Sequence, residues 1–341
     1  MTEQKAQHTG STSGKSISIS GILGELVGSF LIFLAIYLVS ALSPSLYGPS
    51  AILIAAATGL AYAAMTFIFG KFSGGQFNPA VTLAAMLTGK TNFINGLCYI
   101  IAQVLGGIGA GAIVKFVLPT SKAAPAKMWF ANAVNGYDQG SISSAQLQQA
   151  GVSFGIFFAI IVEVLATVIV VAASLRAIDD DGKATKNAAA IMGVAYALGV
   201  TFTYPITGAS LNPARATGIA IFANNAGLAV NPLKQLLIFW ICSILAAAVV
   251  AIVAIVAQML SSKHEEDVEA LDVTADWEKD DNDSKSEVED AESESSEQSA
   301  DFQMPFLGDS NKTEDSATQD ATDNDANDAT IESINFSETK D

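Results

Sequence analysis

The chain has 341 residues, of which 50% are hydrophobic, and a formal net charge of -17. These values conflict for an ordinary soluble protein, and the conflict disappears when the chain is divided near Ser262. Up to that residue the chain carries 7 acidic and 12 basic residues, and after it 27 acidic and 5 basic. The sequence therefore describes a very apolar, mildly basic body followed by an acidic tail, and total charge says nothing about partners of the body.

A polar segment, residues 1–19, comes first, and six long apolar stretches follow it. Each is close to the roughly 20 residues that a helix needs to cross a bilayer. No convincing small-residue cleavage site follows the first stretch, so we expect an uncleaved span rather than a signal peptide. The predicted spans are residues 20–42, 50–70, 93–118, 152–175, 187–206 and 233–260.

Two short segments interrupt this order, one beginning at Asn78-Pro79 and the other at Asn212-Pro213. The apolar stretch after each proline is about ten residues long, which is too short to span a membrane. Asn is a good helix N-cap, and Pro suits the first helical position. The sequence therefore predicts two half-helices that begin inside the membrane.

The residues just before each half-helix form non-helical backbone at membrane depth. Such backbone is tolerated only where it is buried in protein or lines a water-filled cavity. We expect it to line a pore with its carbonyl acceptors, and the expected pore-lining residues are Gly74, Gly75, Gln76, Phe77, Thr207, Gly208, Ser210 and Leu211. Where the two positive N-terminal ends meet, the amides of Asn78 and Asn212 would donate hydrogen bonds to water, and the field would repel cations.

The order span, span, half-helix, span occurs twice, over about residues 20–118 and again over about residues 152–261. Three spans per half give the second half the opposite orientation, so the two halves form an inverted repeat. With both termini in the cytoplasm, Lys and Arg are more frequent on the cytoplasmic side, which favours that orientation. We predict an all-α membrane protein with six transmembrane helices, two re-entrant half-helices and an acidic tail, residues 262–341, that is disordered.

The body, about residues 20–261, resembles the aquaporin or major intrinsic protein family. The resemblance rests on "SGGQFNPAVT" and "NPAR", which stand at matching places in the inverted repeat. It implies a passive channel, not an enzyme, that conducts water and small uncharged solutes (glycerol, hydrogen peroxide, urea) and excludes protons and ions. It further implies a central constriction at Asn78 and Asn212, braces for the broken loops at Glu25 and Glu163, and an outer selectivity filter at Thr58, Val200, Ala209 and Arg215.

The filter departs from both main patterns of that family. Water-selective relatives place an aromatic residue and a His where this chain has Thr58 and Val200. Glycerol-conducting relatives use two aromatics and commonly an Asp after the Arg, where this chain has Ala216. The small side chains favour a wider opening that admits water and small solutes.

Three other functions remain open at this stage. The first is a channel mainly for glycerol or other polyols. The second is an ion-coupled secondary transporter, since inverted repeats and broken helices also build transporters, although no Asp or Glu besides Glu25 and Glu163 lies in a predicted span. The third is an adhesive membrane protein with a vestigial pore.

The sequence calls for no metal, no other cofactor and no nucleic acid. The resemblance implies a homotetramer in a lipid bilayer, most simply the plasma membrane, with both termini cytoplasmic. An unknown cytoplasmic partner for the acidic tail is left open, and its apolar island "FQMPFL", residues 302–307, is the candidate docking motif.

Overall fold

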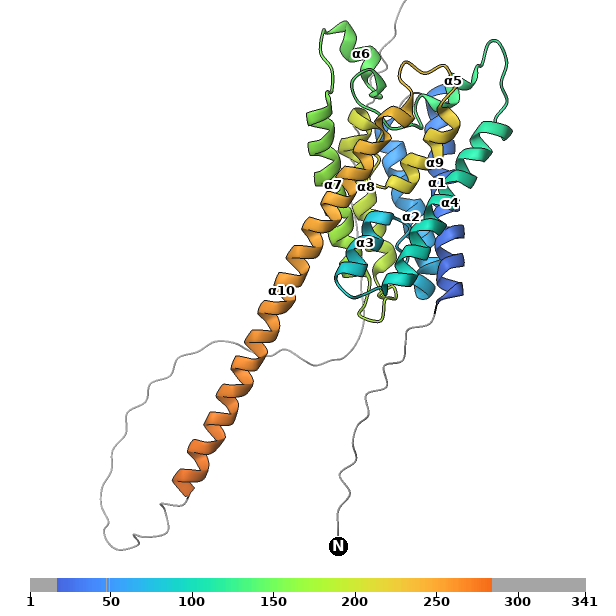
Figure 1. Cartoon of the computed structure of the whole chain (residues 1–341). Helices are drawn as coiled ribbons and strands as arrows, with labels where there is room; N and C mark the ends of the chain where they lie inside the picture. The colour runs from blue at the N-terminus through green and yellow to red at the C-terminus, as the bar shows by residue number, and fades with distance from the viewer. Residues whose placement is uncertain (1–16, 47, 49, 284–341) are drawn as a thin grey trace, which may run out of the picture. The chain divides into compact units, whose positions relative to one another are not determined.

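The computed structural model describes residues 17–46, 48 and 50–283 (Figure 1). The helical bundle belongs to one compact unit, residues 1–277, and residues 278–341 form a second unit, of which the structure describes only the end of the last helix. The helices are α1 (Ile19–Leu46), α2 (Ala51–Ser73), α3 (Pro79–Leu87), α4 (Phe93–Val117), α5 (Ala126–Phe130), η1 (Asp138–Gly140), α6 (Ser144–Gln149), α7 (Ile156–Ala177), α8 (Ala188–Thr207), α9 (Pro213–Ala223) and α10 (Pro232–Asp283).

Six of these helices, α1, α2, α4, α7, α8 and α10, contain stretches long and apolar enough to cross a membrane. The short helices α3 and α9 begin at the two Asn-Pro pairs and lie within the bundle, α3 in its lower part and α9 in its upper part (Figure 1). The prediction of an all-α membrane protein with six spans and two half-helices is confirmed.

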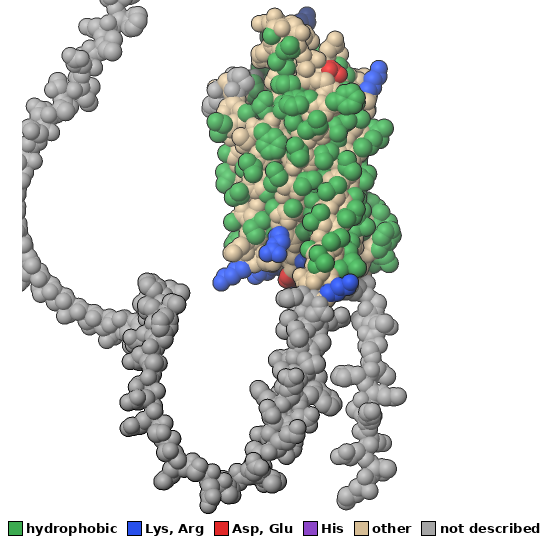
Figure 2. All heavy atoms as spheres, turned by 90° about the vertical axis from the view of Figure 1, so that its left-hand side faces the viewer, with side chains coloured by type: hydrophobic (Ala, Val, Ile, Leu, Met, Phe, Trp, Pro, Cys, Tyr) green, Lys and Arg blue, Asp and Glu red, His purple; other side chains and the backbone are tan. Residues whose placement is uncertain are grey.

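The distribution of side chains is that of a protein surrounded by lipid. Phe67, Phe116 and Phe157 are all more than three quarters exposed, and Figure 2 shows apolar side chains covering the lateral face, with Lys and Arg gathered near its ends. The charged residues Glu25, Glu163 and Arg215 are instead buried. Ionisable groups inside a membrane bundle are costly and mark functional positions.

Glycines allow two pairs of helices to approach closely, α4 with α9 and α2 with α8. A Cβ atom on Gly107 of α4 would lie 2.7 Å from the carbonyl oxygen of Ala214, so the small-residue stripe of α4 receives the half-helix α9. A Cβ atom on Gly59 of α2 would lie 2.5 Å from the carbonyl oxygen of Gly193. The helices α2 and α8 therefore cross at backbone contact near the middle of the bundle.

The connection between α4 and α7, residues 119–151, contains α5, η1 and α6. One other segment differs from its sequence-based description. Disorder was expected from residue 262, but α10 continues to Asp283. The correction has a local cause, because residues 262–283 contain no Gly or Pro and include several good helix formers. Residues 1–16 of the N-terminal segment, most of the acidic tail and its "FQMPFL" island lie outside the described residues.

Candidate functional site

The two half-helices begin in the same way. Asn78 caps α3, with its side-chain oxygen accepting a hydrogen bond from the backbone N–H of Ala80 at 2.9 Å. Asn212 caps α9 by accepting from the backbone N–H groups of Ala214 at 3.0 Å and Arg215 at 3.3 Å. Each proline takes the first helical turn, where its missing N–H costs nothing. Capping uses the oxygen of each asparagine and leaves the Nδ2 donors free to point across the bundle.

Those donors join the half-helices reciprocally. Asn78 Nδ2 donates to the carbonyl oxygen of Leu211 at 2.8 Å, and Asn212 Nδ2 donates to that of Phe77 at 2.7 Å. Phe77 and Leu211 occupy the same place in the two repeats, and both have positive φ angles, 46° and 47°. A bulky residue in this conformation is strained and persists only where its surroundings hold it. The strain occurs at the point where the two broken loops meet.

Glu25 holds the first broken loop in place. Its carboxylate accepts hydrogen bonds from the backbone N–H groups of Gln76 at 2.9 Å and Phe77 at 2.6 Å. It also accepts from Ser73 Oγ at 2.5 Å and Gln103 Nε2 at 2.7 Å. Three of these partners, the two backbone N–H groups and Gln103 Nε2, can only donate, so the arrangement favours an ionised carboxylate.

Glu163 holds the second loop in a matching way. It accepts from the backbone N–H groups of Ser210 at 2.8 Å and Leu211 at 2.9 Å, and from the hydroxyl of Thr207. The inverted repeat that was read from the sequence therefore extends to individual hydrogen bonds. Both glutamates bind to protein donors, as a bracing role requires.

All four residues expected in the outer filter line one narrow cavity. Its volume is about 10 Å³, close to the smallest space that holds one water molecule. The lining residues are Ile36, Ile54, Thr58, Tyr62, Tyr196, Val200, Tyr204, Ala209, Ser210, Leu211 and Arg215. Four of the other expected pore-lining residues lie in the loop that follows α2 in the chain: Gly74, Gly75, Gln76 and Phe77. The remaining two, Thr207 and Gly208, lie beside Asn135.

Arg215 is held rigidly beside this cavity. Its Nη1 donates to the carbonyl oxygens of Gly208 at 3.0 Å and Ala209 at 2.7 Å. The same nitrogen donates to the side-chain oxygen of Asn135 at 2.9 Å. Because the described hydrogen bonds of the guanidinium all involve Nη1, its other N–H groups remain for the cavity that Arg215 lines.

Sequence reasoning missed Asn135, although its side chain binds Arg215. Asn135 lies in the connection between α4 and α7 and is buried, and its Nδ2 donates to the carbonyl oxygen of Thr207 at 3.2 Å. Tyr204 also lines the cavity and donates to the carbonyl oxygen of Asn132 at 2.8 Å. No local pattern marks a loop asparagine as the partner of an arginine far along the chain.

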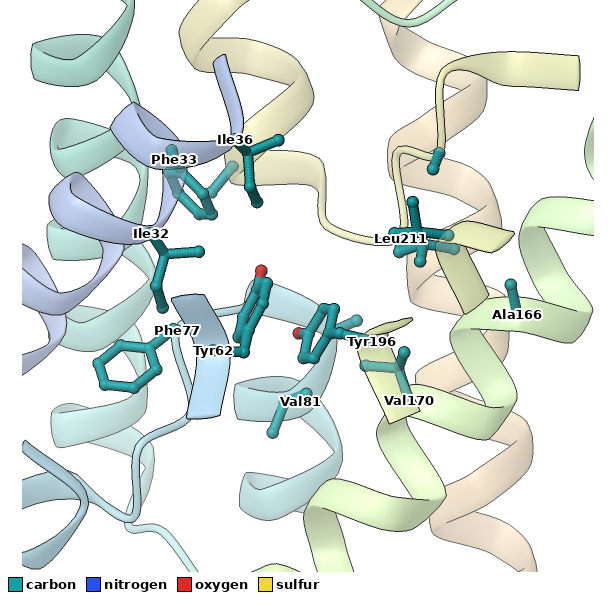
Figure 3. Packing of buried hydrophobic residues seen from close by; sticks show 14 of the residues in the cluster. Ile32, Phe33, Ile36, Tyr62, Phe77, Val81, Ala166, Val170, Tyr196 and Leu211 are labelled. Carbon is teal, nitrogen blue, oxygen red and sulfur yellow. The ribbon is translucent and has the colours of Figure 1, made fainter. Parts of the chain in front are cut away.

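Sequence reasoning also passed over Tyr62 and Tyr196, for which a signal existed. Each tyrosine precedes its Asn-Pro pair by the same number of residues. In the structure both rings lie at the middle of the bundle, between the broken loops (Figure 3). They form the floor of the cavity below the filter residues.

The fold and this site define a membrane protein built on an inverted repeat, with two capped half-helices meeting inside the bundle. A family model described as major intrinsic protein matches residues 13–254. The chain is 32% identical to aquaporin Z of Photorhabdus laumondii over 197 residues, which cover 58% of this chain and 78% of that protein. It is also 32% identical to glycerol uptake facilitator protein-like 6 of Lactiplantibacillus plantarum over 206 residues, covering 60% and 85%.

The fold agrees with these similarities. The aquaglyceroporin of Plasmodium falciparum superposes with a TM-score of 0.53 at 19% identity, over 69% of this chain and 93% of that chain. The chain belongs to the major intrinsic protein family. It is a passive channel for water and small solutes, not an enzyme.

Proposed function

We propose that solutes pass two constrictions in this channel, an outer filter at Thr58, Val200, Ala209 and Arg215 and a central waist at Asn78 and Asn212. The observation that carries the proposal is the single cavity that all four filter residues line. Tyr62 and Tyr196 also line this cavity, and their hydroxyls accept hydrogen bonds from Asn212 and Asn78 at the meeting point of the two half-helices. A solute that leaves the filter therefore meets the waist next.

Unpartnered polar atoms also support a wet path. Among the described residues, Ser210 Oγ, Gln76 Oε1 and Thr66 Oγ1 are buried without a hydrogen-bond partner in the protein. Ser210 lines the cavity, and Gln76 occupies the equivalent place in the other repeat. Buried polar groups of this kind are normally satisfied by water.

Ion exclusion follows from the charges along this path. The N-terminal ends of α3 and α9 each carry about half a positive charge, and Arg215 adds a full one. The carboxylates of Glu25 and Glu163 use their oxygens on the loops and offer them to no passing cation. Neutral water, glycerol, hydrogen peroxide and urea can exchange hydrogen bonds with the lining, whereas a cation, including a proton, meets a positive barrier.

The assembly and location belong to the same proposal. We place the chain in the plasma membrane as a homotetramer, with one pore per subunit and both termini cytoplasmic. The bias of Lys and Arg supports this orientation: Lys71, Lys90 and Arg176 would be cytoplasmic. The proposal includes a cytoplasmic partner, of unknown identity, for the acidic tail.

The experiment measures osmotic swelling of liposomes that contain the purified channel, with water, glycerol, urea and hydrogen peroxide compared. We expect fast, non-saturating flux of water and measurable flux of glycerol or hydrogen peroxide. Thr58→Phe combined with Val200→His should reduce solute flux more than water flux. Leu60→Phe is the matched control, because Leu60 lies on the same helix as Thr58 and is 71% exposed on its outer surface.

Two results would contradict the proposal. Unchanged solute flux in the Thr58→Phe, Val200→His variant would show that these two residues do not lie on the solute path. Flux that saturates and follows an ion gradient would instead favour a secondary transporter.

A further inference from the structure

Two tyrosine rings lie in contact at the waist. The centroids of Tyr62 and Tyr196 are 3.3 Å apart, and their planes differ by 6°. Both residues are about 1% exposed, and Figure 3 shows their rings side by side among the buried residues of the cluster. A separation of 3.3 Å is van der Waals contact between stacked rings, so no water molecule fits between them.

The helix crossing explains why the rings meet. Gly59 and Gly193 bring the backbones of α2 and α8 together. Tyr62 and Tyr196 each lie three residues further on, which places them on the same helix face as the two glycines. The same spacing in both repeats directs the two rings at one another.

The tyrosine hydroxyls accept hydrogen bonds that the two asparagines would otherwise donate to a solute. Asn78 Nδ2 donates to the hydroxyl of Tyr196 at 2.9 Å, and Asn212 Nδ2 donates to that of Tyr62 at 2.9 Å. Each Nδ2 has two hydrogens, and the other one is used on the opposite loop. Both asparagines are therefore fully occupied by protein acceptors, and each phenol oxygen takes the place of a passing water.

We propose that the Tyr62–Tyr196 pair, not the Arg215 filter, is the narrowest point of this channel and sets the size of the solutes that pass. This inference rests on the proposed function, because it concerns the same path. The filter side chains at Thr58, Val200 and Ala209 are small, yet the cavity holds only about one water molecule. The cavity is small because it ends on the two rings, which must part before any solute reaches the lower half.

The test replaces the rings while leaving the filter intact. Tyr62→Leu combined with Tyr196→Leu should raise water flux per inserted channel severalfold and admit polyols larger than those that the unmodified channel passes. Tyr62→Phe and Tyr196→Phe keep the ring but remove one hydrogen bond each. Each should raise water flux about fivefold, which is the factor that corresponds to one ordinary hydrogen bond of about 1 kcal/mol, without changing the size limit. Tyr99→Leu on α4 is the matched control, because Tyr99 lies near Gly21, away from the α2–α8 crossing.

The outcomes are separable. If the leucine pair inserts normally and leaves both water flux and the size limit unchanged, the inference is overturned. If that variant does not insert, the two phenylalanine variants decide, and unchanged water flux in both overturns it. If neither the unmodified channel nor any variant conducts water or solutes, the proposed function itself fails. A rise in flux for Tyr99→Leu as large as for the tyrosine pair would also refute the assignment.

Discussion

Replacing Glu25 with Gln should destabilise the channel more than it slows conduction. Glu25 Oε1 accepts from Ser73 Oγ and the backbone N–H of Gln76, and Oε2 accepts from the backbone N–H of Phe77 and from Gln103 Nε2. Gln has an NH₂ group in place of one oxygen. The Ser73 hydroxyl and the Gln103 amide can turn, but a backbone N–H cannot. Whichever way the new Gln side chain is turned, its NH₂ group therefore faces the backbone N–H of either Gln76 or Phe77, and that N–H loses its acceptor.

The size of the effect follows from that conflict. An orphaned buried N–H costs about 1–3 kcal/mol. The remaining hydrogen bonds lose their charge assistance, but the change also removes a buried charge, and these two effects oppose one another. We therefore expect the free energy of unfolding to fall by about 1–3 kcal/mol, set mainly by the orphaned N–H.

Thermal unfolding of the purified protein in detergent measures this loss, and stopped-flow swelling of liposomes measures flux per folded channel. Asp180→Asn is the control, because it makes the same chemical change on a side chain that is 98% exposed, where we expect less than about 0.5 kcal/mol. An unfolding temperature of Glu25→Gln equal to that of the unmodified protein would refute the reasoning. A variant that is fully stable yet loses all flux would point to a direct role of Glu25 in transport.

Three further changes test other parts of the site. Asn212→Asp removes the donor to Phe77 and places a negative charge at the waist, so we expect proton or cation leakage, measured with a pH-sensitive dye inside liposomes; intact proton exclusion in inserted protein would contradict it. Asn135→Ala removes a partner of Arg215, so the ratio of urea to water flux should rise, and an unchanged ratio would show that the backbone carbonyls alone position the guanidinium. Ending the chain after His264 removes none of the six spans, so water flux per channel should be retained, and its complete loss in inserted protein would place the tail in the conduction path.

The sequence alone was sufficient for the spans, the half-helices and the inverted repeat. Span length and Asn-Pro capping are local properties, and the bilayer forbids most alternatives. Asn78 and Asn212 could be placed at the waist in advance because each is the cap of its own half-helix. The roles of Thr58, Val200, Ala209 and Arg215 came from the family resemblance, and they stay predictions about selectivity even though one cavity brings the four residues together.

Only the tertiary structure determined which side chains close the solute path. The stacking of Tyr62 on Tyr196 depends on how closely α2 and α8 cross, and that distance depends on glycine contacts between segments far apart in the chain. The contact of Asn135 with Arg215 likewise joins an irregular loop to a half-helix. No periodic pattern encodes such pairs, because hydrophobic periodicity reports which face of a helix is buried and not which side chain it meets.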